Sequence, residues 1–450
     1  MAVDFAELER RLVQQLSRVQ SSTAGELRAQ LGISQPTLSR LLGRMSSRVV
    51  VAGRARATRY AARRQAEDLP EHLPIYEIGP NAEARRAASL HAVLPEGYYV
   101  EGEGDDVPSA FHRDLPYYLH ELRPAGFLGR LVPRQHPELG LPADARLWSS
   151  NDVLRYVSRF GWNLPGAFVV GDAALSLYLE RTLRVELVEL RERRRRYPEL
   201  ARDVLSAGTP GSSAAGEQAK FLATRAPGVD VLVKFSTQGK DARSRREADL
   251  LLAEHLAHRI LAEHGQESAR SELVVAEEQT FLEVERFDRL PTGGRRGVIS
   301  LMALDAEYLG SMKSWTDSVV RLAAAGHVPS VAVRPTRIRE LFGLLIGNTD
   351  MHPGNLAFIS RGSRVQALAP SYDMLPMLFA STVGRGERKL ALTTPTPRDA
   401  EVWRVASDAA LEYWAALARE SRLSTRFRGI ALASLDQVRA WREIARRLPS

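Results

Sequence analysis

The spacing of apolar positions in residues 1–65 predicts three short helices at the start of the chain. Between residues 4 and 19 apolar side chains recur every three or four positions, which is typical of an amphipathic helix. Gly32 is suited to end a second helix, and Ser34 to cap a third that tolerates Pro36 in its first turn. The side chains expected on the inner faces of these helices are Phe5, Leu8, Leu12, Leu16, Val19, Leu27, Leu31, Leu38, Leu41, Leu42 and Met45.

The next stretch predicts a β-hairpin that runs from Val49–Ala52 through Gly53 to Ala57–Tyr60. Two short helices joined by a tight turn and followed by a hairpin resemble a winged helix-turn-helix, whose last helix reads DNA. We therefore expect residues 1–65 to form such a domain. The side chains expected to meet DNA are polar or basic and lie on the third helix or near the hairpin tip: Gln35, Thr37, Ser39, Arg40, Arg44, Arg54 and Arg56.

The distribution of charge favours a polyanionic partner for this domain. The 450-residue chain carries a formal net charge of +8, and residues 1–64 contain twelve arginines and four acidic residues, so this segment holds the whole excess. A solvated basic face would have the same charge, and three helices can also form a protein-interaction module. DNA binding is the interpretation that we favour over these two.

A proline-rich polar stretch at 66–80 is expected to be a linker. Beyond it, 98–100 and 168–170 are typical of strands, whereas 115–128 and 172–183 are typical of helices.

A run of small residues at 207–220 is suited to approach phosphate groups closely, although it lacks the spacing of a Walker A loop. It precedes a predicted strand, Asp230–Phe235, that carries Lys234 near its end. Kinases use a lysine in this place to hold the α- and β-phosphates of a nucleotide. An amphipathic helix predicted at 245–264 offers a carboxylate to pair with this lysine. We favour Glu247, which lies nearer the helix start, over Glu254.

A second strand, predicted from Thr280, runs into the extended turn Glu285-Arg-Phe-Asp-Arg289. Such a segment could connect two lobes and offer backbone groups to an adenine, or it could be a charged edge strand. Downstream of residue 288 the pattern is mostly helical, with helices expected at 317–325, 338–346, 400–417 and 435–448.

Polar residues gather in the loop that follows the helix predicted at 338–346. The loop contains Asp350, His352 and Asn355, and Asp373 follows after a predicted hairpin formed by 356–359 and 365–368. A carboxylate, an amide five residues later and a second carboxylate across a hairpin suit phosphoryl transfer. The first carboxylate would orient a hydroxyl nucleophile, while the amide oxygen and the second carboxylate would hold Mg²⁺ on nucleotide phosphates.

The composition narrows the class of protein. A hydrophobic content of 44% and a charged content of 26% are those of an ordinary soluble globular protein. An apolar run of about 18 residues, which a membrane span requires, is missing, and no secretory signal is visible at the N-terminus. The sequence contains no cysteine, which excludes disulfides and thiolate chemistry. We expect a cytoplasmic protein.

From residue 80 to 450 the order of motifs resembles the HipA family of bacterial toxin serine/threonine kinases. The matching motifs are Ser213-Ala-Ala-Gly-Glu-Gln-Ala-Lys220, Val233-Lys234, Val284-Glu-Arg-Phe-Asp-Arg289, Gly347-Asn-Thr-Asp-Met-His352 with Asn355, and Tyr372-Asp373. An attached N-terminal winged helix is similar to the YjjJ-like branch of that family. The resemblance implies an α+β, bilobal, protein-kinase-like fold, with an N-terminal lobe at 81–287 and a helical C-terminal lobe at 288–450.

The resemblance also implies roles for particular residues, with ATP and Mg²⁺ as cofactors. Asp350 would be the catalytic base, aided by His352, and Asn355 and Asp373 would be the Mg²⁺ ligands. Ser213 would be autophosphorylated, which adds about two negative charges beside the nucleotide and silences the kinase. The residues implied to bind the nucleotide are Ala215, Gly216, Glu217, Gln218, Ala219, Lys220, Lys234, Glu285, Arg286, Phe287, His352, Asn355, Tyr372 and Asp373. The implied partners are a protein substrate, DNA and an antitoxin protein.

One departure from the family pattern keeps a second function open. The family carries His-x-Lys-Asn after the catalytic aspartate, whereas here Pro353-Gly354 replaces x-Lys. The loop thus lacks a cation that would offset charge on the γ-phosphate. A DNA-binding regulator whose kinase-like body senses nucleotide is therefore an alternative. A small-molecule phosphotransferase is a third, because aminoglycoside-type kinases have a similar loop, but the Glu-Arg-Phe-Asp-Arg segment argues against it.

Overall fold

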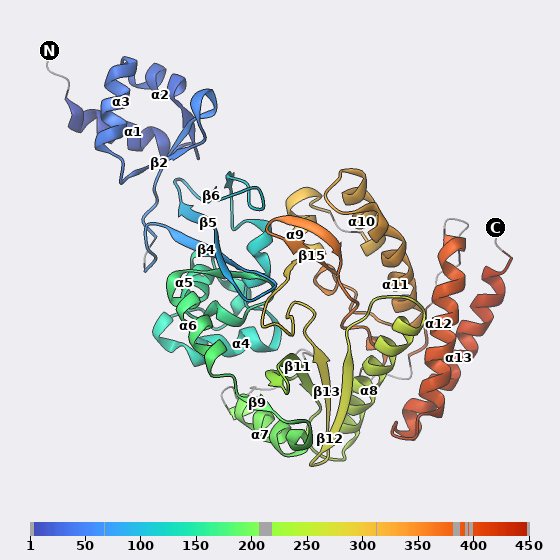
Figure 1. Cartoon of the computed structure of the whole chain (residues 1–450). Helices are drawn as coiled ribbons and strands as arrows, with labels where there is room; N and C mark the ends of the chain where they lie inside the picture. The colour runs from blue at the N-terminus through green and yellow to red at the C-terminus, as the bar shows by residue number, and fades with distance from the viewer. Residues whose placement is uncertain are drawn as a thin grey trace.

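The computed structural model of this chain describes residues 4–66, 68–206, 218–311, 313–380, 388–391, 395 and 399–447 (Figure 1). Within these residues the strands form four sheets, and helices separate or cover them, so the expected α+β class is confirmed. An N-terminal module lies at one end of the molecule and a pair of long helices at the other (Figure 1).

The N-terminal module contains three helices and a three-stranded sheet of order β1-β3-β2. Its elements are α1 (Phe5–Leu16), β1 (Ser22–Thr23), α2 (Ala24–Leu31), α3 (Gln35–Arg44), β2 (Val49–Ala52), the 3-10 helix η1 (Ala55–Ala57) and β3 (Arg59–Ala62). Ser34 caps α3 as expected, and Gly32 ends α2 in the left-handed conformation. The first helix ends at Leu16, so Val19 lies beyond it and is exposed, contrary to expectation. Ser17 caps the helix, and its backbone N–H bonds back to Val13.

The N-terminal module is docked onto the region that follows it. Apolar side chains of β2 and β3 pack with Val93 and Tyr99 in one buried cluster. Backbone hydrogen bonds also cross this contact. The Leu94 N–H donates to the Ala62 carbonyl (2.9 Å), and the Arg64 N–H donates to the Ala92 carbonyl (2.9 Å). The module and the following region therefore share both a core and a hydrogen-bonded edge.

The middle region is a five-stranded antiparallel sheet of order β7-β6-β5-β4-β8 with helices around it. Its strands are β4 (Leu73–Ile78), β5 (Ala84–Ala92), β6 (Tyr98–Gly102), β7 (Ala110–His112) and β8 (Phe168–Val170). Its helices are α4 (Gly126–Gln135), α5 (Ser150–Phe160) and α6 (Asp172–Leu183), with 3-10 helices η2 (Tyr117–Leu122), η3 (Pro137–Leu139), η4 (Ala145–Leu147) and η5 (Gly161–Asn163).

Two predictions for this region are wrong. The expected linker at 66–80 contains β4, whose Leu73, Ile75 and Ile78 are buried in the sheet. Pro74, the second residue of the strand, has no N–H to donate, and its carbonyl accepts the Gly171 N–H (2.8 Å). The single helix expected at 115–128 is two pieces, η2 and α4, because the chain is extended before Gly126.

The next sheet has the order β12-β13-β11-β10-β9 and lies between two helices. The elements are β9 (Leu187–Val188), η6 (Leu190–Glu192), α7 (Arg193–Ser206), β10 (Lys220–Arg225), β11 (Val229–Phe235), α8 (Ala242–Glu263), β12 (Ser271–Ala276) and β13 (Gln279–Glu285). Tyr197 of α7 packs with Val233 on one face of the sheet, and Leu251 of α8 packs with Leu282 on the other. Side chains alternate between faces along a strand, so Lys234 points toward α8.

The remainder is mainly helical and contains a small sheet of order β14-β15-β16. The elements are β14 (Gly297–Ser300), α9 (Leu301–Tyr308), α10 (Trp315–Ala324), η7 (Ser330–Ala332), α11 (Val333–Ile346), η8 (Pro353–Asn355), β15 (Ala357–Arg361), β16 (Arg364–Leu368), η9 (Met377–Phe379), α12 (Ala400–Arg419) and α13 (Thr425–Ala445). The last helix begins at Thr425, well before the expected residue 435, because Ser424 caps it. None of the described helices combines the length and apolar character needed to cross a bilayer.

Candidate active site

The polar loop after α11 is held in place by the buried side chain of Asn348. Gly347 ends α11 in the left-handed conformation, and the chain then turns into the loop. The Asn348 amide oxygen accepts the Asp350 N–H (3.0 Å), and its amide N–H donates to the Asp373 carbonyl (3.4 Å). Asn348 thus ties together the two segments that carry the candidate carboxylates. Sequence reasoning did not single out this residue, although a polar side chain directly after a helix-ending glycine was a usable signal.

Four further hydrogen bonds fix the rest of the loop. The Asn355 amide N–H donates to the Asp350 carbonyl (2.9 Å), and the Gly354 N–H donates to His352 Nδ1 (3.1 Å). The Gly354 carbonyl accepts the Tyr372 hydroxyl (2.8 Å), and the His352 carbonyl accepts the indole N–H of Trp315 (3.1 Å). The side chains of Asp350 and His352 remain exposed at the surface of this ordered loop.

Lys234, Glu254 and Asp373 form a charged cluster between the sheet that contains β11 and the loop after α11. The Lys234 ammonium donates to Glu254 Oε1 at 2.6 Å and to Asp373 Oδ1. The side chains of Lys234 and Glu254 are 7% and 1% exposed, whereas that of Asp373 is 34% exposed. Asp373 is also held at a φ of 51°, a left-handed conformation that is uncommon for residues other than glycine. The buried Lys234–Glu254 pair therefore holds the carboxylate of Asp373, which is partly exposed to solvent.

The electrostatics of the cluster favour the charged forms of Lys234 and Asp373. Burial disfavours the Lys234 ammonium, but Asp373 and Glu254 outweigh it, and the pKa of Lys234 is raised. Burial likewise opposes ionisation of Asp373, but Lys234 and Lys220 outweigh it, and the pKa of Asp373 is lowered. Burial raises the pKa of Glu254, partly offset by Lys234. Asp373 is thus the carboxylate of the cluster most firmly held as an anion.

The preference for Glu247 as the partner of Lys234 is wrong. Glu247 accepts the Thr237 N–H (2.6 Å) and pairs with Arg243 (2.9 Å) near the start of α8. Glu254 lies two turns further along the same helix, at the level where Lys234 reaches it. Which of the two glutamates meets Lys234 depends on how α8 is placed along β11, and the sequence does not show this placement.

Within the run of small residues at 207–220, the residues that the structure describes after 206 begin at Gln218. The Gln218 side chain donates to the Phe235 carbonyl, and the Phe235 N–H donates to Ala219 (3.0 Å). Lys220 lies directly opposite Lys234 across the antiparallel pair of β10 and β11, so both lysines face α8. Ser213, Ala215, Gly216 and Glu217 lie outside the described residues.

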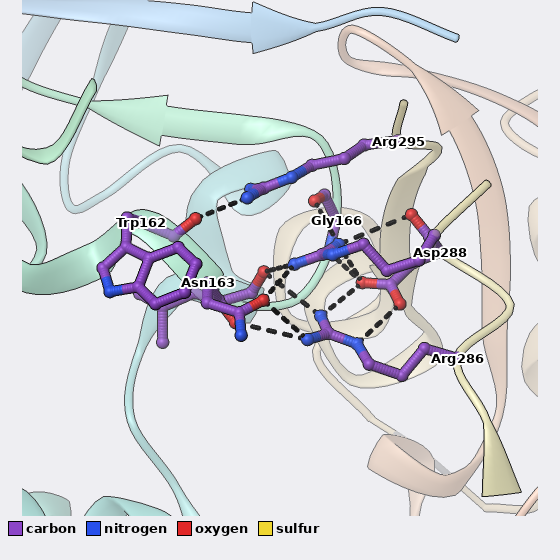
Figure 2. Close-up of polar contacts among 8 residues, drawn as sticks. Trp162, Asn163, Gly166, Arg286, Asp288 and Arg295 are labelled. Carbon is purple, nitrogen blue, oxygen red and sulfur yellow. Dashed lines mark hydrogen bonds and ion pairs between the residues drawn. The ribbon is translucent and has the colours of Figure 1, made fainter. Parts of the chain in front are cut away.

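The segment Glu285–Arg289 connects the sheet that contains β13 to the mainly helical remainder of the chain. Glu285 ends β13 and accepts an N–H from Arg225 (2.7 Å). The Arg286 guanidinium makes a two-pronged contact with Asp288, at 3.1 and 2.9 Å, and turns toward Asn163 of the middle region (Figure 2). The Phe287 ring packs against Tyr372 with centroids 5.6 Å apart. Among the described residues, Phe287 has no backbone hydrogen-bond partner.

Asn355 and Asp373 carry oxygen donors of the kind that Mg²⁺ prefers. Mg²⁺ is bound in proteins by one or two carboxylates together with phosphate oxygens and water. Asp373 is ionised and partly open, and Asn355 uses its N–H on Asp350, which leaves its amide oxygen to coordinate. The described residues hold no cluster of three or more histidine or acidic side chains suited to a metal. Two protein oxygens are a number typical of a magnesium ion that also binds phosphate oxygens and water.

The side chains expected to meet DNA differ in their surroundings. Gln35, Ser39, Arg40 and Arg54 are exposed, whereas the side chain of Arg56 lies outside the described set. Thr37 is buried, and its hydroxyl bonds that of Ser34 (2.9 Å), so its expected outward position is wrong. It lies in the first turn of α3, where the helix packs on the module. Arg44 pairs with Glu9 of α1 (2.9 Å) and lies over Phe5.

Comparisons with known families match most of the chain. A family model described as "YjjJ-like toxin, middle domain" matches residues 69–179, and one described as "HipA-like C-terminal domain" matches residues 212–441. The chain is 36% identical to Toxin YjjJ of Escherichia coli (strain K12) over 433 residues, which is 95% of this chain and 97% of the relative. The family resemblance found in the motifs is thereby confirmed.

One solved structure shares the fold at low sequence identity, and a second aligns over part of the chain. A chain of the complex of HipA, HipB and operator DNA from Shewanella oneidensis MR-1 aligns with a TM-score of 0.50 and 15% identity, covering 83% of this chain and 97% of that one. The proinflammatory kinase CtkA of Helicobacter pylori aligns with a TM-score of 0.39 and 14% identity, covering 52% of this chain and 93% of that one.

Proposed function

The chain belongs to the HipA-like toxin family, and we propose that it is an ATP- and Mg²⁺-dependent kinase that phosphorylates serine or threonine in a protein. The observation that carries the proposal is the Lys234–Glu254–Asp373 cluster, tied through Asn348 to Asp350. Phosphoryl transfer needs a cation on the phosphates, a carboxylate for the metal and a second carboxylate for the nucleophile. The cluster and the loop supply these three groups from separate elements.

In this proposal Asp350 accepts the proton of the attacking hydroxyl. Its backbone is bonded on both sides, by Asn348 and by Asn355, so the carboxylate is presented from a fixed loop. Asn355 and Asp373 would hold Mg²⁺, which when bound offsets charge on the nucleotide phosphates. His352 follows Asp350 by two residues and stabilises the loop by accepting the Gly354 N–H.

The two lysines that face each other on β10 and β11 support binding of phosphate. Like charges in directly opposite positions of a sheet destabilise it unless anions lie nearby. Asp373 and Glu254 offset part of this charge, and Lys220 and Lys234 together would hold the phosphates of ATP. We assign the stretch 207–220 as the phosphate loop, with Ser213 as the site of autophosphorylation.

We assign the segment Glu285–Phe287 as the nucleotide-facing hinge between lobes at 81–287 and 288–450. The side chain of Arg286 is committed to Asp288 and Asn163, so the backbone of Phe287 is the group left to meet an adenine edge. The Phe287 and Tyr372 rings would border the base. The base would then sit close to Asp373, which follows Tyr372 in the chain.

We also propose that residues 1–65 are a winged helix-turn-helix that binds DNA. The order of helices and strands, the exposed arginines Arg40 and Arg54, and the local charge of +8 support this. The solved relative is a complex with HipB and operator DNA. An antitoxin partner and self-sufficient autoregulation both follow as proposals for this chain. ATP and DNA as ligands would place the protein in the cytoplasm.

Transfer of label from γ-³²P-ATP with Mg²⁺ tests the kinase proposal. We expect the chain to label itself, and Ser213→Ala to abolish most of that label while ATP still binds. Tight ATP binding without any transfer to the chain or to added proteins would instead favour a nucleotide sensor. Transfer to aminoglycoside-type small molecules alone would favour the third function.

A further inference from the structure

The loop that follows α5 in the middle region makes many hydrogen bonds with residues 285–289, the segment that contains the proposed hinge. The Asn163 side-chain oxygen accepts from Arg286 (2.9 Å) and from Arg289 (3.0 Å) (Figure 2). Asp288 accepts the Gly166 N–H (2.8 Å), and Arg289 returns a bond to the Gly166 carbonyl (3.1 Å). The carbonyl of Leu164 also accepts from Arg289 (2.8 Å). The contact is therefore reciprocal, with donors and acceptors on both sides.

These contacts anchor the residues on either side of Phe287. Arg286 is bonded through its side chain to Asn163 and through its backbone N–H to the Asp230 carbonyl (2.9 Å). Asp288 is bonded to Gly166 and to the two neighbouring arginines. The two residues that flank Phe287 are thus both bonded to the middle region, and Arg286 is also bonded to β11.

The cluster has an excess of positive charge. Arg286 and Arg289 pair with the Asp288 carboxylate, and Arg295 lies near them, with Asp230 as a second nearby carboxylate, so three guanidinium groups face two carboxylates. Arg295 donates to the Trp162 carbonyl (2.5 Å) and lies over the Tyr178 ring, and its buried Nη1 has no partner among the described residues. Burial lowers the pKa of Arg295 to about 10. Neutral oxygens from residues 162–166 accept the remaining hydrogen bonds of these guanidinium groups.

We propose that residues 162–166, through Asn163, position the hinge for the nucleotide, so that the middle region sets the ATP affinity of the kinase site. The inference rests on the proposed nucleotide function. Asn163 is a positioning residue here, because it acts through Arg286 and Arg289 on Phe287 and touches no reacting atom. The middle region thereby acquires a role that is distinct from DNA binding and from phosphoryl transfer.

Two substitutions at Asn163 test the inference in opposite directions. Asn163→Ala removes an acceptor shared by two guanidinium groups, and we expect the Kd and KM for ATP to rise about tenfold while kcat stays within about a factor of two. Asn163→Asp keeps the acceptor and adds a carboxylate where positive charge is in excess. We therefore expect its ATP affinity to equal or exceed that of the native chain.

Asn151→Ala is a matched control. Asn151 also lies in the middle region, and its side-chain oxygen accepts from the Arg64 guanidinium (3.2 Å) and the Tyr98 hydroxyl (2.9 Å), facing the N-terminal module. We expect this variant to bind ATP like the native chain. Hydrogen–deuterium exchange should show faster exchange at 285–289 in Asn163→Ala and unchanged exchange there in Asn151→Ala.

The outcomes separate this inference from the proposed function. Native ATP affinity and native exchange at 285–289 in Asn163→Ala would overturn the inference, whether or not the chain transfers phosphate. If the chain binds ATP but transfers no phosphate, the kinase proposal fails, and the Kd values still decide the role of Asn163. If the native chain binds no nucleotide, both proposals fall.

Discussion

Lys234 pairs with Glu254 of α8 and not with Glu247 of the same helix. Glu247 and Glu254 are seven residues apart on α8, so they lie on the same side of the helix but about 10 Å apart along its axis. Helical periodicity identifies the face that carries the partner of Lys234, whereas the axial position depends on packing against β11. The structure selects Glu254, at 2.6 Å.

Glu254→Gln is expected to impair the site, because it removes one charge from a buried ion pair. We expect a loss of stability of about 3 kcal/mol and at least a tenfold loss of phosphoryl transfer. Chemical unfolding and the labelling assay measure the two effects. Glu247→Gln, on the same helix face but bonded elsewhere, should behave like the native chain. Equal losses in the two variants would contradict the assigned pair.

The imidazole of His352 explains why position 354 carries a glycine. A Cβ at position 354 would lie 2.9 Å from His352 Cε1, which is closer than such contacts occur, because His352 folds back to accept the Gly354 N–H. The lysine of the family pattern would therefore require His352 to leave this position. The missing cation and the histidine conformation are two aspects of one local arrangement.

A double-mutant cycle tests this coupling. We expect Gly354→Ala to cost about 1 kcal/mol of unfolding free energy in the native background, because it displaces the capping histidine. The same substitution should cost almost nothing after His352→Ala, which gives a coupling energy of at least about 0.5 kcal/mol. Urea unfolding of the four proteins provides the values. Strict additivity would show that His352 does not exclude a side chain at 354.

At the scale of elements, α8 brings a buried histidine next to the charged cluster. His258 Nε2 lies 3.8 Å from Glu254, and the residue is almost fully buried. Burial, with a smaller contribution from Lys234, lowers the pKa of His258 to about 3. The histidine is therefore neutral in the folded protein at pH values where it takes up a proton in the unfolded chain.

This difference predicts acid destabilisation. The unfolded chain binds a proton below about pH 6.5 and the folded chain only near pH 3, so stability falls progressively as the pH drops from 6.5. We expect His258 to account for about 2 kcal/mol of the stability lost between pH 7 and pH 5. His258→Gln should lose that much less over the same interval, as measured by chemical unfolding. An identical pH dependence in both proteins would contradict the assignment.

The elements that the sequence predicts well are those with a long, regular pattern. The helices at α8, α11 and α12 and the strands β11 and β13 are found close to their expected positions, because each contains many buried apolar side chains within a segment bounded by polar residues. Strand β4 is not predicted, since the prolines and charges of residues 66–80 are typical of a linker, while the burial of the strand depends on neighbours far away in the chain. Asp288 and Gly166 illustrate the same limit, because no local pattern brings them together.

At the scale of the whole molecule, the N-terminal module is docked to the middle region rather than tethered to it. The shared cluster around Val93 and Tyr99 and the paired backbone at Ala62 and Leu94 fix its position. The middle region in turn contacts the hinge through Asn163. The proposed DNA-binding surface and the proposed nucleotide site are therefore joined by a continuous series of packed elements.

The DNA-binding proposal predicts a salt dependence that can be assigned to single arginines. Arg40→Ala and Arg54→Ala should each weaken binding to double-stranded DNA and reduce the slope of log K against log salt by about 0.9. Arg146→Ala, an exposed arginine of the middle region that pairs with Asp144, is the control and should leave the slope unchanged. Binding that does not change with salt would favour a protein partner for the module.

Phosphoryl transfer by Asp350→Asn tests the central claim most directly. The substitution keeps the shape of the loop and removes the base, and the Asn348 and Asn355 bonds go to the backbone of residue 350, so ATP binding should survive. We expect transfer of the γ-phosphoryl group to fall at least a hundredfold, with the Kd for ATP within about a factor of three of the native value. Transfer at the native rate by Asp350→Asn would contradict the assignment of Asp350 and the kinase mechanism built on it.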